Sequence, residues 1–134
     1  MRILHILDHS IPLHSGYTFR TAAILREQRA LGWETFHLTS PKQGETKSMV
    51  EEVEGLRFHR TAIPAPARSG IAELRQIAAV QARIEQLAVE IRPDILHAHS
   101  PVPNAIPAIR AGRKLAIPVV YEIRAFWEDA AVDH

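Results

Sequence analysis

Three polar clusters in this chain contain the residue types that take part in chemistry: acids, histidines, serines and a glycine at an expected turn. They occupy residues 8–16, 97–100 and 122–129. Each begins within or directly after a short apolar segment of the kind that forms a buried strand. In an open parallel sheet, ligands bind beyond the carboxyl ends of the strands, where the strand order reverses. We therefore expect the three clusters to meet at one rim of the molecule.

The first cluster leads into Ser15-Gly16-Tyr17, at the start of an expected helix. Unpaired backbone N–H groups and the helix dipole favour a phosphate or carboxylate there, and a glycine lets that group approach the backbone closely. Arg20, one turn further on, either supplements the site or lies in solvent. Gly16 is equally well explained as a turn residue. The chain has neither Gly-x-Gly-x-x-Gly nor a Walker-type lysine loop, which argues against nicotinamide binding and phosphate-loop hydrolysis.

The second cluster contains His97 and His99, which a strand would place on one face. Two such imidazoles can hold zinc, act as a base or hydrogen-bond a sugar hydroxyl. No third ligand has a recognisable spacing, so we expect no metal. In the alternative interpretation, His97 packs structurally in the sheet and His99 is exposed at its end. His99 is the better candidate for function because it lies nearer the strand end.

The third cluster combines acidic, basic and aromatic side chains, namely Glu122, Arg124, Phe126, Trp127, Glu128 and Asp129. Carboxylates in a cleft act as general bases or orient hydroxyl groups, and aromatic rings stack on sugar faces. An ordinary ion pair beside a core tryptophan explains the same residues. Glu122 and Arg124 join Arg20 as secondary candidates for the site.

The elements that must position these clusters alternate between strand and helix. Strands are expected at residues 2–8, 34–40, 50–60, 94–98 and 118–123, the third of them as a strand or a hairpin. Apolar stripes predict two helices: Tyr17, Ile24, Leu25 and Leu31 mark the first, and Ile71, Leu74, Ile77, Ile84, Leu87 and Ile91 mark the second. A third helix begins near Asn104. This alternation predicts an α/β, Rossmann-like parallel sheet of about five strands in the order 3-2-1-4-5, with flanking helices.

Composition narrows the class of protein. A length of 134 residues with 46% hydrophobic content suits one compact domain, and 16 Lys and Arg balance 15 Asp and Glu. No basic block is present, so we expect no nucleic-acid partner. The absence of cysteine fits a reducing compartment, and no apolar run reaches the ~20 residues of a membrane helix. We expect a cytoplasmic protein that can still dock at the inner face of a membrane.

Three stretches together resemble a known family. They are His-Ser-Ile-Pro-Leu-His-Ser-Gly-Tyr-Thr-Phe-Arg at 9–20, Arg-Pro-Asp-Ile-Leu-His-Ala-His-Ser at 92–100, and Pro-Val-Val-Tyr-Glu-Ile-Arg-Ala-Phe-Trp-Glu-Asp at 118–129. In this order they resemble the N-terminal domain of the retaining glycosyltransferases of family 4, also called group 1. The last stretch is similar to the subgroup associated with exosortase and exopolysaccharide systems. The likeness covers essentially all of residues 1–134.

The resemblance implies a GT-B fold, in which this half shapes the acceptor side and a C-terminal domain binds the nucleotide diphosphate sugar. It places Gly16 opposite the donor diphosphate, and His99 and the loop after Glu122 at the acceptor and reaction centre. It implies a hexosyltransferase that retains the anomeric configuration and needs no metal or other cofactor, with a saccharide or lipid-linked acceptor. The family's Glu-x7-Glu motif is absent, so we expect the chain to end before the donor domain and to be inactive alone.

Two positions depart from the family pattern. Many relatives have paired glycines where this chain has Ser15-Gly16, and many have a histidine where it has Arg124. Two other functions remain open: half of a GT-B sugar-nucleotide epimerase, whose catalytic acids would have to lie in this half, and a binding domain without chemistry.

Overall fold

The computed structural model describes residues 1–124, and in this part of the chain six strands form one sheet with three α-helices packed on it. The elements are β1 (Arg2–Leu7), α1 (Gly16–Ala30), β2 (Glu34–Thr39), the 3₁₀ helix η1 (Pro41–Gln43), β3 (Val50–Val53), β4 (Leu56–His59), α2 (Ser69–Ile91), β5 (Ile95–His99), α3 (Val102–Leu115) and β6 (Val119–Glu122). No helix within these residues is long and apolar enough to cross a membrane.

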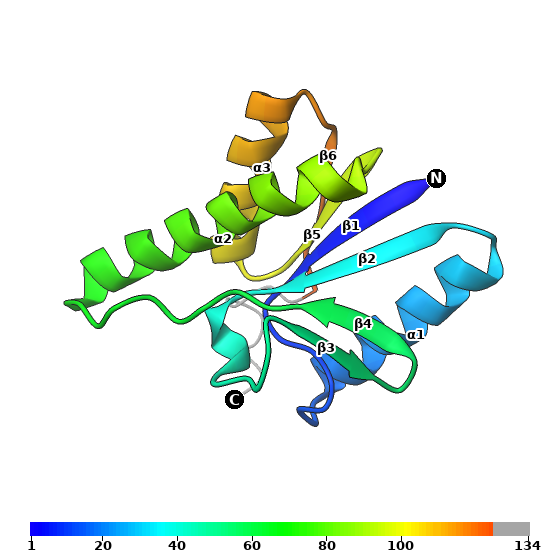
Figure 1. Cartoon of the computed structure of the whole chain (residues 1–134), viewed down its shortest axis with the longest axis horizontal. Helices are drawn as coiled ribbons and strands as arrows, with labels where there is room; N and C mark the ends of the chain where they lie inside the picture. The colour runs from blue at the N-terminus through cyan, green and yellow to red at the C-terminus, as the bar shows by residue number, and fades with distance from the viewer. Residues whose placement is uncertain (125–134) are drawn as a thin grey trace, which may run out of the picture.

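The sheet has the order β3-β4-β2-β1-β5-β6, and every pair is parallel except β3 with β4. The expected order 3-2-1-4-5 is confirmed for the five parallel strands. The sixth strand arises because the segment at 50–60 forms a hairpin, with Glu54 and Gly55 in left-handed conformation at its turn. In Figure 1, α2 and α3 lie together on one side of the sheet and α1 lies on the other.

The face under α2 and α3 is mainly hydrocarbon. Its cluster joins Leu4, Ile6, Leu38, Leu96 and Ala98 of the sheet to Val80, Ile84, Leu87, Ile91, Ala108 and Ala111 of the helices. The stripe predicted in α2 is therefore correct from Ile77 onwards. Ile71 and Leu74 are 51% and 62% exposed, because the first two turns of α2 run past the edge of the sheet (Figure 1).

The face under α1 mixes polar and apolar groups. The stripe predicted for this helix is wrong in detail, since Leu31 is exposed and Tyr17 and Ile24 are only partly buried. The residues that α1 buries are Thr18, Thr21, Ala22 and Leu25. Leu25 and Ala22 pack against an apolar cluster with Leu7, Leu56 and Phe58 of the sheet. Thr18 and Thr21 are also buried by this helix, and the same face of the sheet presents buried histidines and threonines.

Candidate functional site

The N-terminus of α1 has a capping box formed by Ser15 and Thr18, and the space beside Gly16 is open. Ser15 Oγ accepts from the backbone N–H of Thr18 at 3.1 Å, and Thr18 Oγ1 accepts from the N–H of Ser15 at 3.1 Å. A Cβ placed on Gly16 would meet no described atom within 4 Å, and Gly16 does not have positive φ. Its backbone would suit any residue, so turn geometry does not account for the glycine. What the glycine provides is room beside the first helical N–H groups, where an anion is favoured.

Arg124 ties this helix start to the two other polar clusters. Its Nε donates to Glu122 Oε2 at 3.0 Å, its Nη1 to the Tyr17 carbonyl at 2.9 Å, and its Nη2 to Thr21 Oγ1 at 2.7 Å and His99 Nδ1 at 2.6 Å. The guanidinium also lies 4.1 Å from the centre of the Tyr17 ring. The Arg124 side chain is only 7% exposed. It therefore works as a clamp that joins the end of β6 and His99 of β5 to α1, the helix that directly follows residues 8–16.

The hydrogen bond from Arg124 fixes the tautomers of two buried histidines. Arginine only donates, so His99 Nδ1 is an acceptor and the neutral ring carries its proton on Nε2. That nitrogen lies 2.8 Å from His5 Nδ1, and His5 Nε2 lies 2.7 Å from Gln28 Oε1. A one-way chain of donors therefore runs from β6 through β5 and β1 to α1. Both imidazoles are fully buried with both nitrogens engaged.

Burial keeps these rings neutral. It lowers the pKa of His5 to about 3, with the neighbouring His97 acting in the same direction. Burial also lowers the pKa of His99 far below its usual range, and the adjacent His5 is the second-largest cause of that shift. The alternative expectation that His99 is exposed at the strand end is wrong, whereas His97 does pack largely against the sheet. His99 is enclosed, while the side chain of His97 is 15% exposed.

Three histidines form a row across the sheet because their strands pair in register: His5 lies opposite His37 on β2 and His97 on β5. His37 donates through Nδ1 to the Arg57 carbonyl at 2.7 Å, and burial lowers its pKa to about 4. Ligand atoms of His5, His97 and His99 lie within 4.8 Å of one another. The nitrogens of His5 and His99 that share the 2.8 Å hydrogen bond are closer than the roughly 3.3 Å of two nitrogens bound tetrahedrally to zinc. The geometry is that of hydrogen-bonded imidazoles.

Glu122 lies at the open end of this row. Its Oε1 is 3.6 Å from His97 Nε2, and its Oε2 is 3.4 Å from His99 Nδ1. Among residues 1–124, His97 Nε2 is buried without a hydrogen-bond partner. The Glu122 carboxylate is about a quarter exposed, so a ligand at this rim can reach it. Arg20 lies in solvent on α1, one turn beyond Gly16, and Glu128 and Asp129 fall outside the described residues.

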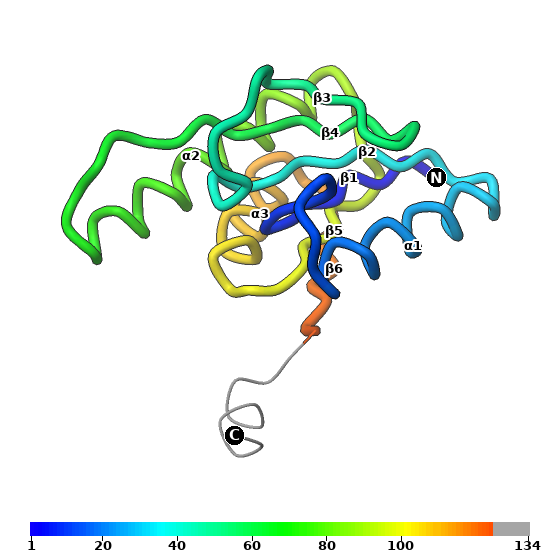
Figure 2. The backbone as a smooth tube through the Cα atoms, turned by 90° about the horizontal axis from the view of Figure 1, so that it is seen from below, coloured from blue at the N-terminus to red at the C-terminus, as the bar shows by residue number. Residues whose placement is uncertain are grey.

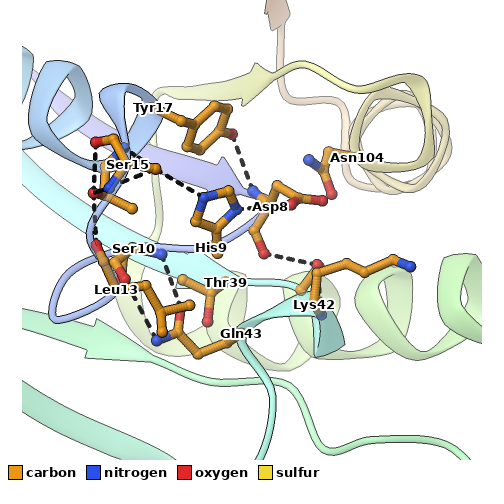
Figure 3. A network of polar contacts seen from close by, with 12 residues as sticks. Asp8, His9, Ser10, Leu13, Ser15, Tyr17, Thr39, Lys42, Gln43 and Asn104 are labelled. Carbon is orange, nitrogen blue, oxygen red and sulfur yellow. Dashed lines mark hydrogen bonds and ion pairs between the residues drawn. The ribbon is translucent and has the colours of Figure 1, made fainter.

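A second polar network lies within the cluster at residues 8–16, which the sequence predicts at the rim without singling out Asp8 or His9. Asp8 and His9 follow β1 directly, and Asp8 Oδ2 lies 2.8 Å from His9 Nδ1 (Figure 3). His9 Nε2 is 3.2 Å from Ser15 Oγ, and its ring stacks on Tyr17 with centroids 4.7 Å apart. Tyr17 OH accepts from the backbone N–H of Asp8 at 3.0 Å, and burial raises the Tyr17 pKa to about 12. An acid-histidine pair just after the central strand was the available signal.

A buried arginine holds the loop that carries this network. Arg60, at the end of β4, is fully buried and donates to Ser10 Oγ at 2.6 Å, to the Ile11 carbonyl at 3.3 Å and to Glu51 Oε1 at 2.8 Å. Gln43 Oε1 accepts from the N–H of Ser10 at 2.8 Å. The loop is therefore bonded from two directions before any ligand arrives. Nothing in the local sequence around Arg60 distinguishes it from a surface arginine.

Comparison with known proteins first defines the class. Similar solved structures include a glycosyltransferase from Streptomyces sp. SF2575 (18% identity, TM-score 0.60, 92% of this chain and 39% of that one) and UDP-GlcNAc 2-epimerase from Neisseria meningitidis bound to UDP-GlcNAc (12%, 0.61, 90% and 31%). Another is the C-terminal domain of a Pyrococcus furiosus hydrogenase (14%, 0.64, 90% and 90%). At these identities the likeness shows the fold alone: a Rossmann-like α/β domain that matches one half of the GT-B enzymes. The chain spans less than two fifths of the glycosyltransferase and of the epimerase.

The family follows from sequence. The model of the glycosyl transferase 4-like domain matches residues 15–134, and the chain belongs to this family. No curated protein matches the chain significantly. The resemblance inferred from the three stretches is therefore confirmed for the glycosyl transferase 4-like family as a whole.

Proposed function

We propose that this chain is the N-terminal, acceptor-side half of a retaining glycosyltransferase that moves a hexosyl group from a nucleotide diphosphate sugar to a hydroxyl acceptor. The acceptor is a saccharide or a lipid-linked molecule at the cytoplasmic face of a membrane, in exopolysaccharide or other glycoconjugate synthesis. Donor binding belongs to a C-terminal domain outside this chain, and the reaction needs no metal or other cofactor.

The observation that carries this proposal is the convergence at Arg124. In a chain of the glycosyl transferase 4-like family, one guanidinium contacts the fixed His99, the part-exposed Glu122 and the carbonyl of Tyr17, which follows Gly16 at the helix start. The free N–H groups beside Gly16 suit the charge that develops on a departing diphosphate, although most of that charge would be stabilised by the donor domain. Glu122 would orient the acceptor, and His99 would hold Arg124 in place.

The test compares the chain alone with the chain fused to the donor-binding domain of a family member. Both are incubated with UDP-glucose, UDP-N-acetylglucosamine, GDP-mannose and dTDP-rhamnose plus a membrane lipid extract, and nucleoside diphosphate release and glycosylated product are measured. We expect product from the fusion and none from the chain alone. Turnover by the isolated chain would contradict the division of labour.

A glycine pair sharpens this test. Gly16→Ala adds a methyl group where the diphosphate would approach, in space that is otherwise empty, so we expect a loss of at least about tenfold in kcat/KM with an unchanged melting temperature. Gly70→Ala is the matched control, because Gly70 lies in the first turn of α2 and also has open space. Equal activity of the two variants would remove Gly16 from the donor side.

An epimerase half is the second candidate, favoured by the structural likeness to UDP-GlcNAc 2-epimerase. Glu122, together with Glu128 and Asp129, is a candidate for the acids that an epimerase would need. Replacing these three residues in the fusion and measuring sugar epimerisation against transfer separates the two functions, because an epimerase converts its nucleotide sugar without any acceptor.

A further inference from the structure

A groove runs along one side of α2. Three adjoining hollows form it, with volumes of about 370, 380 and 290 Å³, each near the lower limit of small-molecule pockets. The first two share Met49, Thr61 and Ala62, and the last two share Ile63. Because the lining residues of α2 recur every three or four positions, one face of the helix borders the groove for about 21 Å. These residues are Ala72, Gln76, Ala79, Arg83 and Gln86.

The opposite wall of the groove is the loop at residues 61–68, which follows β4. Figure 2 shows this loop, in green, leaving the sheet and α2 returning beside it. Arg75 fastens the two together, because its Nη1 donates to the carbonyls of Ala65 at 3.2 Å and Pro66 at 3.3 Å. Pro64 and Pro66 have fixed φ angles and no N–H group, so this wall is stiff and offers few donors. The groove is therefore preformed.

Apolar groups make up most of the lining, and further apolar side chains stand exposed beside it. Six alanines, three prolines, Met49 and Ile63 line the groove. Ile63, Ile71 and Leu74 are 55%, 51% and 62% exposed. A cluster of exposed apolar groups in one place commonly marks a binding site. Narrow walls of methyl and methylene groups suit an aliphatic chain, whereas a sugar needs more hydrogen-bonding partners.

Basic side chains surround the groove in excess. Within the lining segments 41–49 and 61–86, three acidic side chains are outnumbered by five basic ones, Lys42, Lys47, Arg68, Arg75 and Arg83. This surplus of two compares with a surplus of one in the whole chain. One of the acids, Glu85, is already paired with Lys114 at 2.8 Å, whereas Lys42 forms no ion pair within residues 1–124. The charge favours a ligand that joins an aliphatic chain to an anionic group.

Lys42 lies where the groove reaches the rim. It belongs to η1, directly after β2, and it lines one of the three hollows. The neighbouring Ser40 Oγ donates to the Asp8 carbonyl at 2.8 Å, so this segment is bonded to the first polar cluster. Figure 3 shows Lys42 and Asp8 in the same region of the rim. An anion at Lys42 would therefore lie between the apolar groove and the polar rim.

Resting on the function proposed above, we propose that the groove binds the isoprenoid chain of an acceptor whose saccharide is linked to that chain through a phosphate. The chain lies between α2 and the loop at 61–68, and its transfer out of water provides most of the binding free energy. Lys42 contacts the phosphate, and the saccharide beyond it extends along the rim. A groove takes up a single chain, whereas contact with a bilayer needs a protruding face.

The test measures binding of farnesyl phosphate to the 134-residue chain by isothermal titration calorimetry, with farnesol and inorganic phosphate as partial ligands. We expect farnesyl phosphate to bind at least about tenfold more tightly than either. Ala72→Phe fills the groove and should weaken this binding by about tenfold or more, with an unchanged melting temperature. Ala78→Phe is the matched control, because Ala78 is an exposed alanine of α2 that lines none of the three hollows.

A charge variant keeps the test decisive even where Ala72→Phe fails to fold. Lys42→Gln should weaken binding of farnesyl phosphate by about threefold to tenfold and leave binding of farnesol unchanged. Lys114→Gln is its control, since Lys114 is an exposed lysine on α3. In ¹⁵N NMR spectra of the parent, farnesyl phosphate should shift the amide signals of residues 61–67 and 72–86.

Four results would overturn the proposal. They are no binding of farnesyl phosphate by the parent, equal binding by Ala72→Phe and Ala78→Phe, no effect of Lys42→Gln, and amide shifts confined to other segments. Binding to vesicles of phosphatidylcholine and phosphatidylglycerol without affinity for farnesyl phosphate would make the patch a membrane contact instead. None of these measurements needs a donor sugar. A fused enzyme that transfers nothing while its farnesyl phosphate binding is intact would contradict the proposed function and leave the groove assigned.

Discussion

The two faces of the sheet are built on different principles. The face under α2 and α3 presents Leu4, Ile6, Leu38, Leu96 and Ala98, and every side chain there gains by leaving water. The face under α1 combines the apolar cluster of Leu7, Leu56 and Phe58 with buried polar side chains, each of which needs a partner. The buried polar residues are His5, Thr35, His37 and His99. The first face mainly stabilises the fold. The second face is less stabilising, because it holds buried polar groups in fixed orientations next to the rim. A domain of this kind can change its chemistry on one side without rebuilding the other.

Acid should expose the difference between the faces most strongly. The folded-state pKa values of His5, His37 and His99 lie far below 6.5, so below that pH the unfolded chain binds protons that the folded chain refuses. Stability is then full above pH 6.5 and is lost as pH falls towards about 4, by about 1.4 kcal/mol per pH unit for each histidine and about 4 for the three. Urea unfolding at pH 7, 6 and 5 measures this slope. A slope of one proton or fewer would show that at least two of these three histidines are protonated in the folded state.

The hydrocarbon face should respond to truncation rather than to pH. Ile84 of α2 is fully buried, and Ile84→Ala should lower the free energy of unfolding by about 2–5 kcal/mol through lost burial and a cavity. Val89→Ala on the same helix should change it by less than about 0.5 kcal/mol, because Val89 is 73% exposed. Equal effects, measured by denaturant titration at pH 7, would contradict the assignment of the core.

Removing the clamp should affect the polar face with a smaller loss of stability. Arg124→Ala strips a donor from His99 and leaves Glu122 without its closest partner, so we expect a loss of about 1–3 kcal/mol. The specific readout is ¹⁵N NMR of the His99 ring, which should show the proton on Nε2 in the parent and lose that preference in the variant. Arg110→Ala, an exposed arginine on α3, is the control. An unchanged His99 tautomer would remove Arg124 from the head of the hydrogen-bond chain.

Much of the fold could be predicted because it depends on local pattern. Continuous apolar runs located β1 and β5, and Gly32 and Pro93 follow the ends of α1 and α2, where a glycine and a proline commonly stop a helix. The apolar stripe of α1 could not be predicted, since which side of that helix faces inward depends on the histidines beneath it. Those histidines come from three strands, and only the register of His5 with His37 and His97 brings them together.

The candidate site divides in the same way. Gly16, His99 and Glu122 were found from their positions at element ends, and the structure brings their surroundings together. Their roles remain proposals. Most of the bonds that set those surroundings join residues 20 to 107 positions apart, the longest being the bond from Arg124 to Tyr17, and no spacing in the chain predicts such a bond.

The buried guanidinium of Arg60 has a consequence for any ligand of the rim. It fastens Ser10 and Ile11, fifty residues upstream, from inside the molecule. The segment that carries Asp8 and His9 thus acquires its shape during folding, and the entropy of ordering it is already lost before any ligand binds. Binding there should be fast and should need little movement of the main chain, because no conformational entropy is lost in ordering this loop when the ligand binds.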